Sequence, residues 1–191
     1  MFRRLKVGGA VTATYANYNI RIASIADAAL LAQLGVQTFR EAFGRFIPPA
    51  DLEAYLGATY SPARQMDELT NPSKILLIIE SEGLAVGYAM LHAREAPPVA
   101  ATENAIELAR LYLLHDAIGH GLGAALMSKC IEESRRRAHQ AIWLQVWERN
   151  ERAIAFYKKW GFEAVGIGYK ELGDTTGTDL IMARMLQVES G

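Results

Sequence analysis

The apolar and polar positions of the chain follow two periods, one typical of strands and one typical of helices. Strand-like patterns cover residues 19–23, 74–80, 84–94, 104–114, 141–147, 162–171 and 179–187. Helical spacing, with capping residues at the start of each segment, covers residues 24–43, 51–56, 61–69, 119–138 and 150–160. This order predicts an α/β fold in which a mixed central sheet of six to seven strands carries helices on both faces. In the fourth strand the apolar positions switch from even to odd numbers between Leu108 and Leu111, which indicates a β-bulge.

Glycines open the helix that follows the fourth strand. Residues 113–125 read L-L-H-D-A-I-G-H-G-L-G-A-A, with Gly119, Gly121 and Gly123 where the helix begins. A helix start presents unpaired backbone N–H groups and the positive end of the helix dipole, and glycine lets a phosphate approach the backbone closely. A plain packing turn has the same pattern, so these residues alone leave both interpretations open. The spacing matches neither a P-loop nor the dinucleotide fingerprint.

The helix after the fifth strand carries a second candidate pair. Asn150 and Tyr157 are seven residues apart, so they share one helical face and could point into one cleft. The alternative is a capped amphipathic helix with Phe156 and Trp160 in the core. The pattern by itself does not separate the two.

Composition narrows the class of protein. The chain has 191 residues, 51% hydrophobic and 21% charged, with a formal net charge of −1, which is ordinary for a globular domain and offers no positive field for nucleic acid or an anionic membrane. The only cysteine, Cys130, cannot form an internal disulfide, and the four histidines lack metal-ligand spacing, so no metal is expected. We expect a cytoplasmic protein with a flexible extension over residues 1–18 and one domain over 19–191.

The two candidate segments together resemble one family. The motif residues are Ile118-x-x-Gly121-x-Gly123, Asn150, Ala153, Phe156-Tyr157 and Gly161-Phe162. In this combination they resemble the GCN5-related N-acetyltransferases (GNAT) over roughly residues 19–187, most specifically over 106–166. The stretches I-E-L-A-R-L-Y-L and W-L-Q-V-W-E-R-N, with residues 172–182, resemble the polyamine-acetylating PaiA-type branch more narrowly. Ile118 is a departure, because the family usually carries Arg or Gln there.

The resemblance implies a GNAT fold whose sheet splays between strands 4 and 5, with acetyl-CoA as cosubstrate and direct attack by an amine. It implies Tyr157 as the acid for the leaving thiolate. Glu107 is the candidate base, with a solvent-facing carboxylate as the alternative. The implied cofactor-binding residues are Leu111, Tyr112, Leu113, Ile118, Gly119, His120, Gly121, Leu122, Gly123, Ala124, Asn150 and Ala153. Because residue 118 is not basic, the pyrophosphate would rest on backbone N–H groups, the helix dipole and His120.

The expected acceptor is a small amine, with polyamines first. Residues 37–70, which would wall the acceptor side, hold five acids (Glu41, Asp51, Glu53, Asp67, Glu68) and three bases (Arg40, Arg45, Arg64), a mildly acidic balance. Protein N-termini or amino acids are the alternative acceptors, and Arg40 or Arg45 would then bind a carboxylate. A non-catalytic acyl-CoA-sensing regulator is the competing class, favoured by Ile118. The oligomeric state stays open, with a homodimer as one option.

Overall fold

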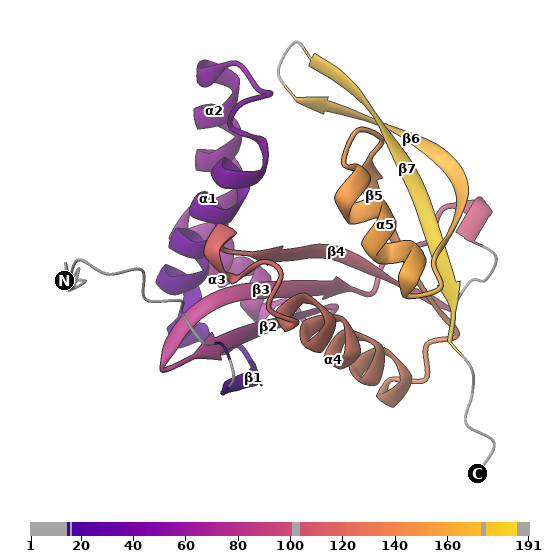
Figure 1. Ribbon diagram of the computed structural model, residues 1–191, viewed down its shortest axis with the longest axis horizontal. Helices are drawn as coiled ribbons and strands as arrows, with labels where there is room; N and C mark the ends of the chain where they lie inside the picture. The colour runs from indigo at the N-terminus through magenta and orange to yellow at the C-terminus, as the bar shows by residue number, and fades with distance from the viewer. Residues whose placement is uncertain (1–14, 16, 101–103, 173–174, 187–191) are drawn as a thin grey trace.

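The structure is a computed structural model, and it describes residues 15, 17–100, 104–172 and 175–186. Its seven-stranded sheet has the order β1-β2-β3-β4-β5-β7-β6 (Figure 1). The strands are β1 (Tyr18–Ile22), β2 (Lys74–Ser81), β3 (Leu84–His92), β4 (Ala105–Leu113), β5 (Ala141–Trp147), β6 (Glu163–Leu172) and β7 (Thr175–Met185). The helices are α1 (Ala28–Phe43), α2 (Pro49–Tyr60), α3 (Pro62–Thr70), α4 (Leu122–Arg136) and α5 (Glu151–Lys159), with short 3-10 turns at Ile25–Asp27, Pro98–Ala100 and His115–Ala117.

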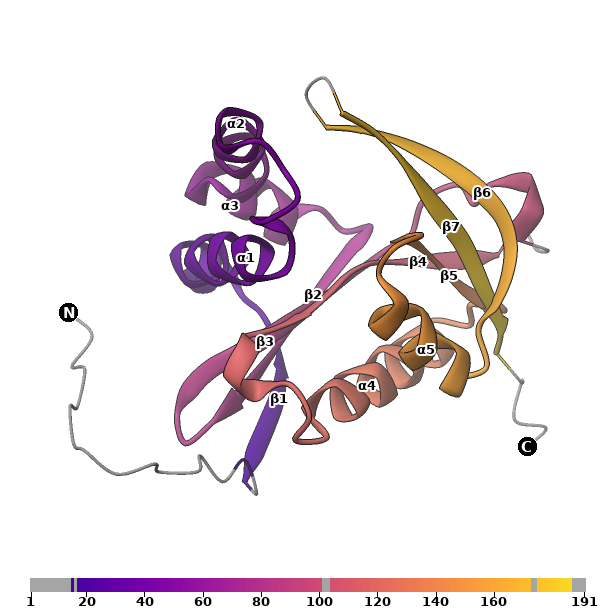
Figure 2. The ribbon, with the colours of Figure 1, turned by 45° about the horizontal axis from the view of Figure 1, so that its top comes forward.

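Helices cover both faces of the sheet, as predicted. On β2, Leu76 and Ile78 pack with α1, α2 and α3, whereas Leu77 and Ile79 belong to the core beneath α4. Figure 2 shows α1–α3 on one side of the sheet and α4 and α5 on the other. The strict alternation of a pleated strand therefore divides one apolar run between two cores.

The elements agree with the sequence pattern except at some of their ends. The prediction for α2, residues 51–56, was too short. This helix begins at Pro49 and continues to Tyr60, because Leu52, Leu56 and Tyr60 recur at four-residue spacing and are all buried. β7 begins at Thr175, before the start predicted at residue 179, and residues 173–174 lie outside the described residues.

The sheet splays between β4 and β5. The two strands pair in parallel only from Ala105–Ala141 to Glu107–Trp143, and beyond that point they diverge while β5 pairs with β7 along its other edge. The predicted bulge lies at the same place: Leu108 pairs with Leu91 but Arg110 pairs with Met90, so Ala109 is the extra residue. The bulge turns the rest of β4 away from β5 and opens the sheet.

Asp27 fixes the start of the first helical segment. Its carboxylate accepts hydrogen bonds at 2.8 Å from both Nη atoms of Arg21 and at 2.8 Å from the backbone N of Ser24. Ser24 and Asp27 thus form a capping-box contact. The Arg21 guanidinium lowers the pKa of Asp27 to about 2, although burial opposes this shift. The chain is therefore held where it passes from β1 into α1.

The described part of the predicted N-terminal extension contacts the domain. Tyr18 already belongs to β1, and the ring of Tyr15 lies 4.8 Å from that of His120. Residues 1–14 and 16 lie outside the described residues, so the flexibility expected there is untested. In the part of the chain that the structure describes, no helix is both long enough and apolar enough to cross a membrane.

Candidate active site

One cavity of about 750 Å³ occupies the splayed region. Its lining includes Leu111 and Leu113 of β4 and Phe156 of α5, which face the α4 side of the sheet. The same lining includes Phe39 and Tyr112, which belong to the core on the α1 side. The cavity therefore passes through the sheet between β4 and β5 and opens toward both faces.

The backbone of β4 is aimed into this gap. The N–H of Leu114 donates to Val86 O of β3 at 2.9 Å. Two residues earlier in the chain, Tyr112 of β4 pairs with Tyr88 of β3 in the same register. In an antiparallel ladder alternate residues bond to opposite sides, so the N–H and C=O groups of Leu111 and Leu113 point toward β5. Because β5 has diverged, these groups offer a free strand edge to an extended ligand.

The start of α4 closes one end of the cavity. Gly119 and Gly121 have φ of +91° and +82°, left-handed values that favour glycine, and Gly121 is the N-cap. The first intrahelical bond is from Ala125 N to Gly121 O, so the N–H groups of residues 122–124 project from the helix start. The residues lining this end of the cavity are Ile118, Gly119, Gly121, Gly123 and Ala124.

Two predicted cofactor-binding residues are not part of the lining. His120 is exposed and lies against Tyr15, and the side chain of Leu122 is fully buried in the core beneath the sheet. Leu122 therefore offers only its backbone N–H to a ligand. His120 therefore lies outside the cavity lining in which the resemblance placed it. The turn before α4 directs its imidazole toward Tyr15, in the segment that precedes β1.

Asn150 and Tyr157 both line the cavity from α5. Asn150 Oδ1 accepts from Ala153 N at 3.2 Å and so caps the helix, which leaves the amide Nδ2 to donate. Burial raises the pKa of Tyr157 well above its usual value, and the nearby Cys130 thiol contributes. The phenol therefore stays protonated at neutral pH. Cys130 itself is fully buried with a raised pKa, as expected for a structural thiol.

The helix α5 ends with a Schellman motif. Phe162 N donates to Tyr157 O at 3.1 Å and Gly161 N donates to Lys158 O at 3.0 Å, with Gly161 at a φ of +77°. This closure fixes the last turn of α5, which carries Tyr157.

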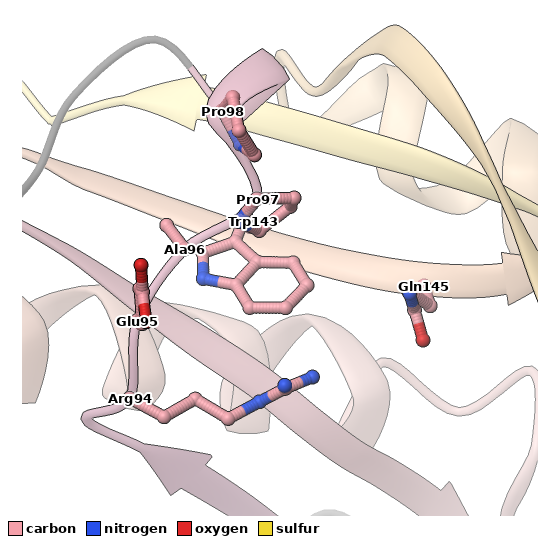
Figure 3. Close-up of a pocket in the computed structure, with 7 residues that line it drawn as sticks. All are labelled: Arg94, Glu95, Ala96, Pro97, Pro98, Trp143 and Gln145. Atoms are coloured by element: carbon pink, nitrogen blue, oxygen red, sulfur yellow. The ribbon is translucent and has the colours of Figure 1, made fainter.

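Glu107 lies at the point where β4 and β5 part, but it does not face solvent. Its side chain is 9% exposed, and its carboxylate accepts from Arg94 Nε at 2.5 Å and from Arg94 Nη2 at 2.8 Å. The alternative of a solvent-facing carboxylate is therefore wrong. The Arg94 guanidinium also lies 4.8 Å above the ring of Trp143. A second cavity of about 330 Å³ lies here and shares Gln145 with the first (Figure 3).

Comparison with known proteins decides the family. Residues 37–162 match the Acetyltransferase (GNAT) family. An uncharacterized N-acetyltransferase of Mycobacterium tuberculosis is 34% identical over 160 residues, which are 84% of this chain and 98% of the relative. The chain belongs to the GNAT acetyltransferase family.

Two solved structures share the fold of this GNAT protein. The PaiA N-acetyltransferase of Thermoplasma acidophilum, solved in complex with coenzyme A, gives a TM-score of 0.72 at 21% identity, covering 88% of this chain and 99% of that one. The ribosomal-protein-S18-alanine N-acetyltransferase of Escherichia coli gives a TM-score of 0.64 at 19% identity, covering 90% and 95%.

The family assigns the reaction class. The GNAT protein is an acetyl-CoA-dependent N-acetyltransferase, and acetyl-CoA is its cosubstrate. Among the described residues, no group of three or more His, Cys, Asp or Glu side chains could hold a metal ion.

Aromatic side chains that the sequence analysis missed line the other end of the cavity. The ring of Trp147 lies 4.9 Å from that of Phe46 and 6.3 Å from that of Phe43, across the gap between β5 and the end of α1. Trp147 lines the cavity because β5 no longer has β4 beside it at this position. The spacing of Phe39, Phe43 and Phe46 was available in the sequence but is the same as that of a core stripe.

The acidic wall expected from residues 37–70 is smaller than the count indicated. Of its five acids only Glu41 lines the cavity, where its Oε2 accepts from His115 N at 2.8 Å. Glu68 is instead buried and holds Arg110 through bonds of 2.7 and 3.0 Å. Two other carboxylates, Glu107 and Asp179, reach this end of the cavity from β4 and β7. Its acidic character therefore comes from three separate elements.

Proposed function

We propose that this GNAT enzyme transfers the acetyl group of acetyl-CoA to the primary amine of a small acceptor, with polyamines as the first candidates. The single observation that carries the proposal is the cavity through the sheet. It places a free strand edge and a helix start on one face, and aromatic rings and carboxylates on the other. Two substrates can therefore approach from opposite faces and meet between β4 and β5.

The roles on the cofactor side follow from the groups present. The backbone of Leu111 and Leu113 would bond the pantetheine amides as an added strand, and a β4 N–H near Leu113 would hold the oxyanion. Asn150 would donate its free amide from across the gap. The N–H groups at the start of α4 would bind the pyrophosphate. None of these roles requires a covalent acyl-enzyme, in keeping with a fully buried Cys130.

Tyr157 is the proposed donor to the departing thiolate. Its raised pKa keeps the phenol protonated over the whole range in which the enzyme would work. The same shift makes full proton release costly, so the phenol acts first as a hydrogen-bond donor to the developing negative charge on sulfur.

Glu107 is the proposed base, acting through a water molecule because Arg94 occupies both of its oxygens. An alkylamine of pKa about 10.4 costs roughly 4–5 kcal/mol to deprotonate at pH 7, so direct attack needs such an acceptor for the proton. The pair with Arg94 fixes the direction of the carboxylate.

The acceptor end of the cavity suits a cationic acceptor better than an acceptor that carries a carboxylate. Glu41 and Asp179 supply negative charge beside the Glu107–Arg94 pair, and the faces of Phe43 and Trp147 attract ammonium groups. The two arginines expected to bind a carboxylate each have a partner, and neither of them lines the cavity. Arg40 pairs with Glu53 at 3.0 Å, and the Arg45 guanidinium lies 4.5 Å above the Phe46 ring. Resemblance to PaiA agrees with a polyamine, whereas the likeness to the S18-alanine enzyme keeps peptide N-termini as the alternative.

Turnover assays test the proposal. Release of coenzyme A, followed with a thiol-reactive dye, is measured with spermidine, a free amino acid and a short peptide at two salt concentrations. We expect the highest kcat/KM for spermidine and a decrease as salt rises, because salt screens the attraction of a polycation to carboxylates. A preference for the amino acid or peptide would overturn the polyamine assignment alone. Binding of acetyl-CoA without turnover of any amine would instead support the acyl-CoA-sensing regulator.

A further inference from the structure

The glycine-rich end of the cavity carries no charged side chain of its own. The lining residues among 118–124 are Ile118, Gly119, Gly121, Gly123 and Ala124. Coenzyme A carries a pyrophosphate and a 3′-phosphate, whereas a helix start supplies only about half an elementary positive charge. Further positive charge near the phosphates is therefore expected from another element.

Three arginine or lysine side chains line the cavity within the described residues: Arg110, Arg152 and Lys159. Arg110 is committed to the buried Glu68 and lies on the acceptor face. Arg152 and Lys159 are exposed on α5, and none of the ion pairs formed among the described residues uses either of them. Arg152 and Lys159 are therefore the lining cations that remain available to bind a phosphate.

The geometry of α5 directs the pair toward the start of α4. Arg152, Phe156 and Lys159 are spaced four and three residues apart, so they share one helical face. A Cβ placed on Gly123 would lie 3.8 Å from Phe156 Cε2, which shows that this face lies against the first turn of α4. Arg152 and Lys159 therefore stand on either side of the contact between the two helices.

We propose that Arg152 and Lys159 bind the phosphate groups of coenzyme A and supply the charge that position 118 lacks. The inference rests on the proposed function, since it concerns the cofactor of that reaction. The two cations approach from α5, while the backbone N–H groups of α4 approach from the opposite side. The cofactor phosphates are then held between two helices rather than by one loop.

Titration calorimetry with acetyl-CoA tests the pair. We expect the Kd of the Arg152→Ala/Lys159→Ala variant to rise at least tenfold at low salt, and the dependence of Kd on salt to become weaker. Lys158→Ala is the matched control, because Lys158 is the exposed neighbour on the same helix and does not line the cavity. Its Kd should change less than twofold.

Selectivity between two thioesters gives the second readout. Acetyl-pantetheine lacks the phosphates, so the ratio of kcat/KM for acetyl-CoA to that for acetyl-pantetheine should fall at least tenfold in the double variant. An unchanged ratio, or an equal rise of Kd in Lys158→Ala, overturns the inference. Failure of the wild-type protein to bind acetyl-CoA at all would instead overturn the proposed function, so the two failures are distinct.

Discussion

The two ends of the cavity are built in different ways. The cofactor end comes from two continuous segments, residues 111–124 and 150–159, in which many of the candidate binding groups are backbone N–H and C=O groups. The acceptor end comes from α1, β4, β5 and β7, and it is made of side chains such as Glu41, Phe43 and Asp179. In the proposed function, the cofactor is therefore bound largely by main-chain geometry that a short motif encodes, whereas the acceptor is selected by side chains brought together only by the fold.

Tyr157 lies where the two ends meet, and its removal should have the largest effect. Tyr157→Phe removes the donor to the departing thiolate, so kcat should fall by about 10²–10⁴ with little change in the Kd of acetyl-CoA. Steady-state kinetics and calorimetry measure the two quantities. Tyr169→Phe is the control, because Tyr169 is 80% exposed on β6. An unchanged kcat would remove Tyr157 from the reaction.

Glu107 tests the acceptor end alone. Glu107→Gln should lower kcat/KM for the amine by about 10² near pH 6, and the loss should shrink as pH rises because more of the amine is already deprotonated. Arg94→Gln is the matched variant, since it breaks the same pair but keeps the carboxylate. Equal losses in both variants, with no dependence on pH, would mean that the pair is only structural.

Gly123 tests the cofactor end alone. Its backbone is helical and an added Cβ would meet Leu113 at an ordinary 3.6 Å, so Gly123→Val should fold while filling the space beside the α4 start. The stabilisation expected from acetyl-CoA at 100 times its Kd, about 2.7 kcal/mol, should be lost in thermal unfolding. Gly57→Val in α2 is the control, because an added Cβ there meets nothing within 4 Å. A full shift in Gly123→Val would separate the glycine from cofactor binding. Gly121 suits this test less, since its φ of +82° would strain any substitute.

The same contrast explains what the sequence could predict. The strands, the bulge at Ala109 and the cap at Asn150 follow from local periodicity and capping chemistry, and the structure has all of them. The aromatic acceptor wall could not be predicted, because Phe43 and Trp147 meet only after β4 and β5 part. Likewise the pairing of Arg110 with Glu68 joins residues 42 positions apart, so a count of charges along residues 37–70 overstated the acidity of the cavity. His120 followed from its motif position alone, and its side chain lies elsewhere.

The smallest effect is expected at the Asp27–Arg21 ion pair, which holds the start of α1 beside the acceptor end of the cavity. It is measured as a change of the free energy of unfolding with pH. The pKa of Asp27 is lowered from 3.8 to about 2 by Arg21, so the pair stabilises the folded protein above pH 4, and this contribution disappears as pH falls toward 2. The shift corresponds to about 2 kcal/mol at neutral pH. Asp27→Asn should lose that amount at pH 7 in urea unfolding, and its difference from the wild type should narrow between pH 4 and 2.

Hydrogen exchange shows whether the loss stays at one end of the cavity. Asp27 precedes α1, so amides of α1 should exchange faster in Asp27→Asn while those of α4 keep their protection. Asp67→Asn on the exposed side of α3 is the control and should change neither quantity. If α4 loses protection as much as α1, the two ends unfold as one cooperative unit. The difference between them would then be one of chemistry and not of stability.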